Sequence, residues 1–290
     1  MMRPGDFDAE ALRAVVVGKF PQLADAPFHI MGAGWDSVAL AVGDHVFKFP
    51  RNAIAATALR REANLLRQIG PAVSMPVPRM DLSETPTLFS SHIGIAGDHL
   101  LTDAYERLGD AQRQALGDAM GQFYAQLHAL PVTVMIEAGA LPAYRWLDAA
   151  TIERQSFPLL DAAERAWAGQ ILTRWVALGP DPHGNIYGYF DGHGWNMAFD
   201  HEHGRLNGLY DFADSGIGPL HQEFLYSSFI SADLTARIVA AYERHAGRSL
   251  ERERIAVLTG VHRLWELAAA ENADDATEML ASVRAWMAAG

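Results

Sequence analysis

The sequence predicts an α+β protein with two lobes, a small sheet-rich N-terminal lobe (residues 1–94) and a larger helical C-terminal lobe (residues 95–290). Three observations support this prediction. The first third contains short apolar runs separated by glycine and proline, a pattern typical of strands and turns. After about residue 97, apolar residues recur at helical spacing over long segments. The chain contains no internal repeat, and 290 residues allow one large domain or two modest lobes.

The N-terminal lobe is expected to begin with a hairpin. Two strand-like runs flank the turn signal Gly-Asp at residues 43–44, which predicts an antiparallel pair. A helix is expected over residues 55–70, where apolar side chains form one stripe and Gly-Pro ends the pattern. Further strands are expected at 76–82 and 87–95.

The C-terminal lobe is expected to be mainly helical, with one hairpin near residues 195–211. Helices are predicted at 111–130, 159–178, 234–246 and 250–270.

Net charge, the lack of cysteine and the lack of long apolar runs limit the functional classes to which the protein can belong. The net charge of −12 works against nucleic-acid binding, which depends on clustered Lys and Arg. It favours a cationic small molecule as partner, or it serves solubility alone. Without cysteine, any metal site must use oxygen or imidazole ligands. The first ten residues lack the features of a signal peptide, and no apolar run approaches the roughly 20 residues of a membrane span, so we expect a cytoplasmic protein without membrane contact.

A lysine and a glutamate in the N-terminal lobe form a candidate pair. Glu62 lies at helical spacing from Leu59, Leu66 and Ile69, so a helix would place its carboxylate on the buried face. A buried, unpaired carboxylate is costly, so a cation must come from elsewhere in the fold. Lys48, in "HVFKFP", is the candidate because strand alternation turns it away from the flanking phenylalanines. Protein kinases hold nucleotide phosphates with such a pair; alternatively, both side chains are solvated.

The segment "MGAGWDSVA" precedes the lysine strand. Gly32 and Gly34 would let the backbone approach a phosphate closely, and Ser37 would add a hydroxyl donor. The alternative is an ordinary turn before a hairpin.

The segment "GYFDGHGWNMAFD" contains polar side chains at a spacing that fits neither a helix face nor a strand, which indicates a loop with a site. Four residues separate Asp191 from Asn196, as in the catalytic loop of phosphoryl transfer. Asp211 in "GLYDFADSG" follows a short apolar run and precedes a phenylalanine, like the magnesium-binding aspartate of a kinase. Taken singly, each of these residues is also a common turn former.

In this order the segments resemble the aminoglycoside phosphotransferase family of small-molecule kinases. The family's catalytic segment commonly reads His-Gly-Asp-x-His-x-x-Asn; residues 189–196 read Tyr-Phe-Asp-Gly-His-Gly-Trp-Asn, so Tyr189 and Phe190 replace the first His and Gly. "GAGWDSVALAVGDHVFKFPR" resembles the nucleotide loop and lysine strand, "REANLL" the glutamate helix, "QLHAL" the helix before the substrate region, and "DFADSGIGP" the metal-binding segment. The resemblance spans residue 32 to about 224.

The resemblance implies a two-lobed protein-kinase-like fold and a Mg²⁺-dependent kinase that uses ATP or GTP. Asp191 would orient or deprotonate the acceptor hydroxyl, and Asn196 and Asp211 would hold magnesium on the phosphates. Lys48 would contact the phosphates and be positioned by Glu62. Catalysis would consist mostly of positioning and electrostatics.

The resemblance also places the nucleotide base at the lobe connection, near the backbone of Gly94 and Ile95. His193 is expected to hydrogen-bond within its loop or to touch the transferring phosphate, and Asp214 to brace its own loop. The "DHEHG" segment at 200–204 is interpreted as a solvated hairpin turn rather than a metal site.

The expected partner is a small-molecule acceptor with a hydroxyl group. An aminoglycoside-type antibiotic is favoured, which would make the protein a resistance enzyme. A macrolide, an amino alcohol and a sugar are alternatives. A non-catalytic nucleotide-binding module, suggested by Tyr189 and Phe190, is the alternative from another class, but the presence of every phosphate and metal residue argues against it.

Overall fold

The structure is a computed structural model that describes residues 8–33 and 37–289. The chain folds into two compact units and passes from one to the other repeatedly. Unit 1 contains Met1–Leu100, Ala129–Ala140 and Trp195–Ala213, and unit 2 contains Leu101–His128, Leu141–Gly194 and Asp214–Gly290. A domain boundary between residues 94 and 95 remains a prediction.

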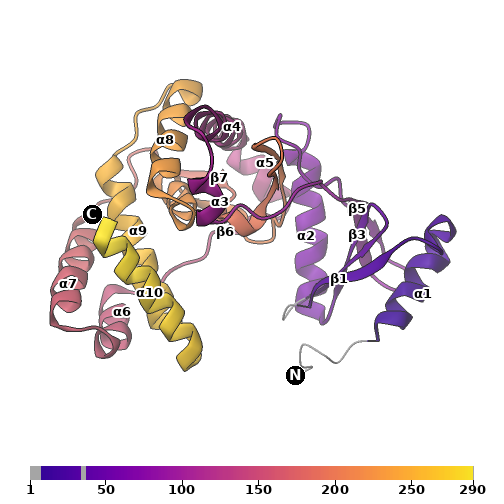
Figure 1. The fold of residues 1–290 in the computed structure, drawn as a ribbon, viewed down its shortest axis with the longest axis horizontal. Coiled ribbons are helices and arrows are strands. Elements are labelled where there is room, and N and C mark those ends of the chain that lie inside the picture. Colours follow the sequence, from indigo (N-terminus) through magenta and orange to yellow (C-terminus); the bar gives the residue numbers. More distant parts are fainter. Residues whose placement is uncertain (1–7, 34–36, 290) are drawn as a thin grey trace. The chain divides into compact units, whose positions relative to one another are not determined.

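Unit 1 is built on a five-stranded antiparallel sheet in the order β1-β2-β3-β5-β4 (Figure 1). Its strands are β1 (Phe28–Ala33), β2 (Ser37–Val42), β3 (His45–Pro50), β4 (Asp81–Ser83) and β5 (Phe89–Ile93). The predicted hairpin is the β2–β3 pair, in which Ala39 faces Lys48. One sheet face is covered by helix α1 (Ala9–Lys19) and the short 3-10 turn η1 (Pro21–Leu23), with Val16, Leu40 and Phe47 fully buried between them. Strand β3 thus lies at the centre of the sheet.

Helix α2 (Ala53–Ile69) confirms the helix predicted from the apolar stripe. It starts at Asn52, whose side chain accepts a hydrogen bond from the N–H of Ala55. The strand expected at 76–82 is wrong in its first half, since β4 begins only at Asp81. Pro76 and Pro78 explain this difference, because proline cannot donate a ladder hydrogen bond.

Three further elements complete unit 1. They are α5 (Val132–Glu137), β8 (Met197–Asp200) and β9 (Arg205–Leu209). Strands β8 and β9 pair antiparallel and confirm the predicted hairpin. The 3-10 turn η3 (Gly194–Asn196) precedes β8 at the point where the chain enters unit 1.

Unit 2 is mainly helical. Its helices are α3 (Thr102–Glu106), α4 (Asp110–His128), α6 (Ala149–Ser156), η2 (Phe157–Leu159), α7 (Ala162–Ala177), η4 (Leu220–Phe229), α8 (Ala232–Ala246), α9 (Arg252–Ala269) and α10 (Ala273–Ala289). The predicted helices correspond to α4, α7, α8 and α9. Helices α6, α7, α9 and α10 surround one apolar core, which includes Ile152, Val261 and Leu264. A small sheet of β6 (Leu141–Pro142), β10 (Gly216–Pro219) and β7 (Asn185–Gly188), in that order, leads into the predicted catalytic loop.

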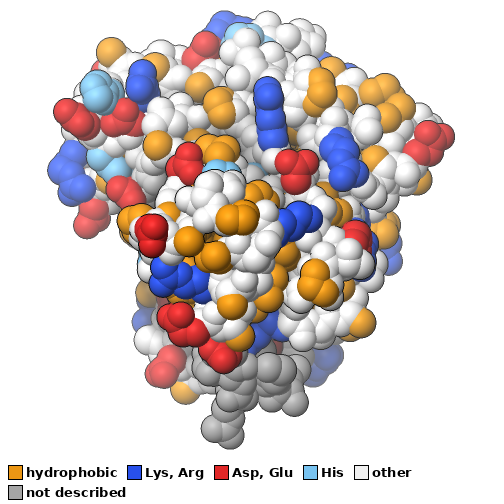
Figure 2. Space-filling model, turned by 90° about the vertical axis from the view of Figure 1, so that its right-hand side faces the viewer, with side chains coloured by type: hydrophobic (Ala, Val, Ile, Leu, Met, Phe, Trp, Pro, Cys, Tyr) orange, Lys and Arg blue, Asp and Glu red, His pale blue; other side chains and the backbone are white. Residues whose placement is uncertain are grey.

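The antiparallel N-terminal sheet and the helical C-terminal part confirm the predicted α+β class. Figure 2 shows hydrophobic, acidic and basic side chains interspersed over one face of the molecule. Within residues 8–33 and 37–289, none of the helices has both the length and the apolar character needed to cross a bilayer.

Helices α4 and α8 approach closely at Gly121. A Cβ atom at this position would lie 2.5 Å from the Cβ of Ala241 and 2.7 Å from the backbone nitrogen of Tyr242. Real Cβ atoms do not come so near, so only glycine allows this packing distance.

We therefore expect Gly121→Ala to lower the free energy of unfolding by about 1–2 kcal/mol, because overpacking outweighs the gain in helix propensity. The matched control is Gly169→Ala in α7, where no atom lies within 4 Å of the added Cβ. This variant should be more stable by about 0.5–1 kcal/mol. Urea unfolding of both variants measures the difference, and a neutral Gly121→Ala would contradict the packing argument.

Candidate active site

Unit 1 contains a cavity of about 610 Å³, within the usual size range of small-molecule sites. Six of the predicted site residues line it: Lys48, Glu62, Gly94, Ile95, Asn196 and Asp211. Gly32 in β1 and Ser37 in β2 are not among the described lining residues, although their neighbours Met31 and Ala39 are. Gly34 lies outside the described residues. The cavity thus brings together Lys48 and Asp211, which are 163 positions apart in the sequence.

Lys48 lies between two carboxylates. Its Nζ is 3.4 Å from Oε1 of Glu62 and 3.1 Å from Oδ1 of Asp211. The Glu62 side chain is 4% exposed and the Lys48 side chain 18%, whereas that of Asp211 is 48% exposed. The structure therefore contains the predicted pair of a strand lysine and a helix glutamate, and it adds the aspartate. One end of the cluster is closed to water, and the Asp211 end is open.

Burial and charge act in opposite directions on this cluster. Burial alone would lower the pKa of Lys48, but the Glu62 and Asp211 carboxylates more than offset it, so the pKa is raised. Burial raises the pKa of Glu62, against the opposing effect of the Lys48 ammonium and of the Phe212 N–H. Lys48 is thus a firmly protonated cation, suited to an anionic group such as a phosphate.

The backbone around Asp211 is held in a rare conformation. Asp211 has φ 61°, in the left-handed region that non-glycine residues seldom adopt. The N–H of Phe212 donates to Oε1 of Glu62 at 3.1 Å, and Nη2 of Arg61 donates to the carbonyl of Ala213 at 3.0 Å. Helix α2 therefore fixes the conformation that carries Asp211 to the cavity.

Asp191 lies in unit 2, in the loop after β7. Its side chain is 22% exposed, and Oδ1 is 2.9 Å from Nε2 of His193. The backbone N–H of His193 donates to the carbonyl of Asp191 at 2.9 Å. This agrees with the expected hydrogen bonding of His193 inside the loop, which orients the carboxylate.

The residue before Asp191 also has a positive φ: 53° at Phe190. Glu223 of η4, which is fully buried, accepts the N–H groups of Tyr189 at 2.7 Å and Phe190 at 2.9 Å. Nε2 of His128, at the end of α4, is 3.2 Å from the same carboxylate. Glu223 thus fixes the backbone that carries Asp191.

This role of Glu223 was not predicted from the sequence. The sequence contains one signal for this role: Glu223 begins the mainly apolar run "EFLYSSF". A carboxylate beside such a run is expected to be buried and to need hydrogen-bonding partners.

The loop also requires a glycine after the aspartate. A Cβ at Gly192 would overlap the hydroxyl of Tyr124, a fully buried side chain of α4. Any larger residue would displace the loop or the tyrosine.

The "DHEHG" segment forms the turn between β8 and β9, as predicted. Nδ1 of His203 is 2.9 Å from Oδ2 of Asp200, and Nε of Arg205 is 3.3 Å from the same oxygen. In the described part of the chain, no group of three or more His, Asp or Glu side chains is arranged to hold a metal ion by itself.

Fold and site together define an α+β protein of the kinase-like type, with a lysine–glutamate–aspartate cluster in a cavity of small-molecule size. The family model of the phosphotransferase enzyme family (APH) matches residues 30–258. The chain belongs to this family and is a phosphotransferase. No curated protein sequence matches the chain.

Solved structures share the fold at low sequence identity. The GDP complex of wild-type aminoglycoside 2'-phosphotransferase-IIIa superposes with a TM-score of 0.81 at 20% identity, covering 97% of this chain and 99% of that chain. The macrolide 2'-phosphotransferase type I gives a TM-score of 0.63 at 15% identity, with coverage of 93% and 97%. The macrolide 2'-phosphotransferase MphH from Brachybacterium faecium gives 0.66 at 15% identity, with coverage of 95% and 97%. The predicted kinase-like fold is confirmed.

A double-mutant cycle tests the buried pair. Lys48→Met leaves a buried carboxylate without its cation, and Glu62→Gln removes the buried one of the two charges that Lys48 faces, so each should destabilise by about 2–4 kcal/mol. The double variant should be more stable than the sum of the singles predicts by about 1–3 kcal/mol. The exposed pair Arg60–Glu84, joined at 2.6 Å, is the control and should give a much smaller coupling. Equal couplings in both cycles would contradict the buried arrangement.

A second prediction concerns His92 in β5. Burial, aided by the charge of Lys48, lowers the pKa of His92 from 6.5 to about 4. The neutral ring therefore contributes stability that is complete above pH 6.5 and is lost as the pH falls through 4. The wild type should lose up to about 3 kcal/mol more than His92→Gln between pH 6.5 and 4. Denaturant unfolding across this range measures the two slopes, and identical slopes would refute the assignment.

Proposed function

We propose that this phosphotransferase moves the γ-phosphoryl group of ATP or GTP to a hydroxyl group of a small molecule, with magnesium as cofactor. The observation that carries the proposal is the Lys48–Glu62–Asp211 cluster in a cavity of about 610 Å³ that Gly94 and Ile95 also line. A fixed ammonium beside an acidic metal ligand is what triphosphate binding requires.

The donor set in the cavity fits magnesium. Asn196 and Asp211, which both line the cavity, offer an amide and a carboxylate oxygen. Mg²⁺ takes one or two carboxylates and fills its remaining positions with water and phosphate oxygens. The two residues would hold the ion together with the nucleotide. When bound, the ion would neutralise charge on the β- and γ-phosphates.

The protein groups have separate roles in the proposed reaction. Lys48, positioned by Glu62, binds the phosphate oxygens. Asp191 accepts the proton of the acceptor hydroxyl while the hydroxyl oxygen forms a bond to the γ-phosphorus. The bond between this phosphorus and the β,γ-bridging oxygen breaks, and the nucleoside diphosphate leaves. His193, at 2.9 Å from Asp191, holds the carboxylate in one orientation.

Among acceptors we favour an aminoglycoside-type antibiotic. Structures of the same fold were determined as a GDP and kanamycin complex, a gentamicin complex and a streptomycin–ATP complex. The net charge of −12 agrees with a cationic acceptor. A macrolide is the second candidate, because macrolide 2'-phosphotransferases share the fold. An amino alcohol or a sugar would use the same chemistry.

Substitution of Asp191 separates chemistry from nucleotide binding. We expect Asp191→Asn to lower turnover by about 10²–10⁴-fold, because the proton acceptor is lost. Nucleotide affinity, measured by calorimetry, should change little, because the lysine cluster is untouched. Asp103→Asn, an exposed position in α3, is the matched control and should keep full activity.

The assay is transfer of labelled phosphate from ATP and from GTP to panels of aminoglycosides, macrolides and small metabolites. Tight nucleotide binding without transfer to any acceptor, water included, would support a non-catalytic module and overturn the proposal. Undiminished turnover by Asp191→Asn would remove the role of that residue only.

A further inference from the structure

The residue before Asp211 makes contacts to which the proposed function assigns no role. Tyr210 directly follows β9 and lines the same cavity as the two proposed magnesium ligands, Asn196 and Asp211. A peptide bond joins it to Asp211. The position of Tyr210 therefore affects one of the two ligands directly.

Tyr210 also holds the turn that carries the other ligand. Its backbone N–H donates to the carbonyl of Asn196 at 3.1 Å. Its hydroxyl donates to the carbonyl of Trp195 at 2.9 Å and lies 3.4 Å from the carbonyl oxygen of Met197. Because a hydroxyl has one proton, the shorter contact with Trp195 is the main hydrogen bond. One residue thus contacts three successive carbonyls, and Asn196 carries the middle one.

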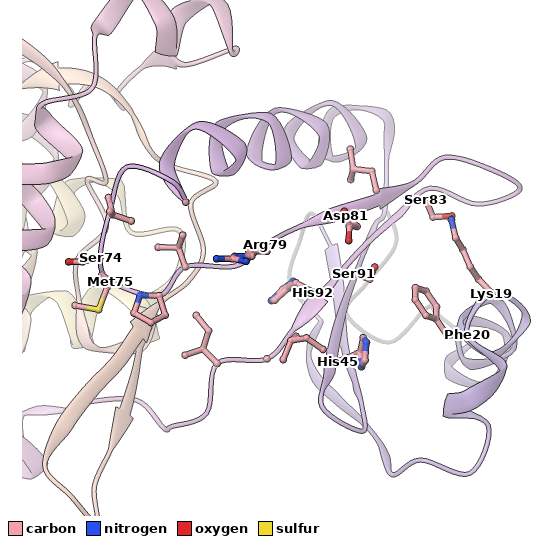
Figure 3. Close-up of a pocket in the computed structure, with 18 residues that line it drawn as sticks. Lys19, Phe20, His45, Ser74, Met75, Arg79, Asp81, Ser83, Ser91 and His92 are labelled. Carbon is pink, nitrogen blue, oxygen red and sulfur yellow. The ribbon is translucent and has the colours of Figure 1, made fainter.

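The strand before Tyr210 is fixed independently of the tyrosine side chain. The N–H of Leu209 donates to the carbonyl of Pro76 at 3.0 Å, in the segment 74–79, whose two end residues are labelled in Figure 3. A Cβ at Gly208 would lie 2.5 Å from the same carbonyl oxygen, so β9 and this segment are in close contact. Removal of the hydroxyl alone should therefore leave the strand in place.

The turn that carries Asn196 needs support from outside. It is the short 3-10 turn η3 (Gly194–Asn196), and 3-10 turns have poorer hydrogen-bond geometry than α-helices. Mg²⁺ demands near-ideal octahedral geometry, so its ligands must be held in one orientation. Groups that orient metal ligands through hydrogen bonds commonly change metal affinity by about 10–100-fold.

We propose that the Tyr210 hydroxyl is a positioning group for the magnesium site. Through the carbonyl of Trp195 it fixes the turn that carries Asn196, while the main chain of Tyr210 leads directly into Asp211. The inference rests on the proposed function, in which Asn196 and Asp211 hold Mg²⁺ together with the nucleotide phosphates. Tyr210 acts through these two ligands and does not itself contact the ion.

Tyr210→Phe tests the proposal, because it removes the hydroxyl and keeps the ring and the backbone N–H. Calorimetry on the full chain measures the affinity for ADP without divalent metal, with saturating Mg²⁺ and with saturating Ca²⁺. The metal-free affinity should be unchanged, because the lysine cluster is untouched. The affinity for ADP with Mg²⁺ should fall about tenfold. The affinity with Ca²⁺ should fall less, because Ca²⁺ accepts more flexible geometry than Mg²⁺.

Tyr105→Phe in α3 is the matched control, since it removes a hydroxyl that donates to Asp233 within unit 2. All three affinities of this variant should match those of the wild type. Equal affinity of the wild type and Tyr210→Phe for ADP with Mg²⁺ would overturn the inference. Losses of equal size with Mg²⁺ and Ca²⁺ would overturn it as well, since they would indicate a general structural effect. If the ADP affinity of the wild type did not respond to Mg²⁺, the proposed magnesium site itself would be wrong, and the inference would fall with it.

Discussion

The need to neutralise one buried carboxylate determines which segments of unit 1 are packed together. Glu62 lies on the apolar face of α2 at 3% exposure, so the fold must supply a cation and hydrogen-bond donors to it. Lys48 comes from the central strand and the Phe212 N–H from the segment after β9. Two distant parts of the chain are therefore tied to helix α2 through one side chain, and the same arrangement places Asp211 in contact with the lysine. The fold of unit 1 and the proposed phosphate binding thus depend on the same interaction between Lys48 and Glu62.

A buried glutamate also fixes a loop in unit 2. There the buried carboxylate is Glu223, and it accepts two backbone N–H groups from the residues that precede Asp191. Both loops contain a non-glycine residue with positive φ, Phe190 in one and Asp211 in the other. Such residues cost of order 1–3 kcal/mol each and persist only where neighbouring contacts over-determine the backbone. A buried glutamate next to each strained residue provides those contacts.

Features that depend on short-range sequence patterns were predicted correctly. The hairpin turn, the apolar stripe of α2 and the position of Glu62 on that stripe follow from short-range periodicity, and all are present. The partnership of Lys48 and Glu62 followed from the cost of a buried charge. The Lys48–Asp211 contact and the anchoring by Glu223 link residues that no periodicity connects, so they need the fold. Helix α1 and helix α10 were not predicted, and β4 is shortened by prolines whose effect on strand pairing was overlooked. The roles of the site residues remain predictions.

In the proposed function, Lys48 faces the phosphates of a bound nucleotide. An acyl phosphate of ATP tests this role, because the deprotonated fraction of a lysine amine beside the γ-phosphate attacks the acyl carbonyl. The bond between the acyl carbon and the phosphate oxygen breaks, ATP leaves, and the lysine keeps the acyl group as an amide. The chain has only two lysines, Lys19 and Lys48, so mass spectrometry gives an unambiguous answer. We expect acylation of Lys48 that excess ATP suppresses, with Lys19 unmodified. Acylation of Lys19 alone, or labelling of both lysines that ATP does not suppress, would contradict this role of Lys48.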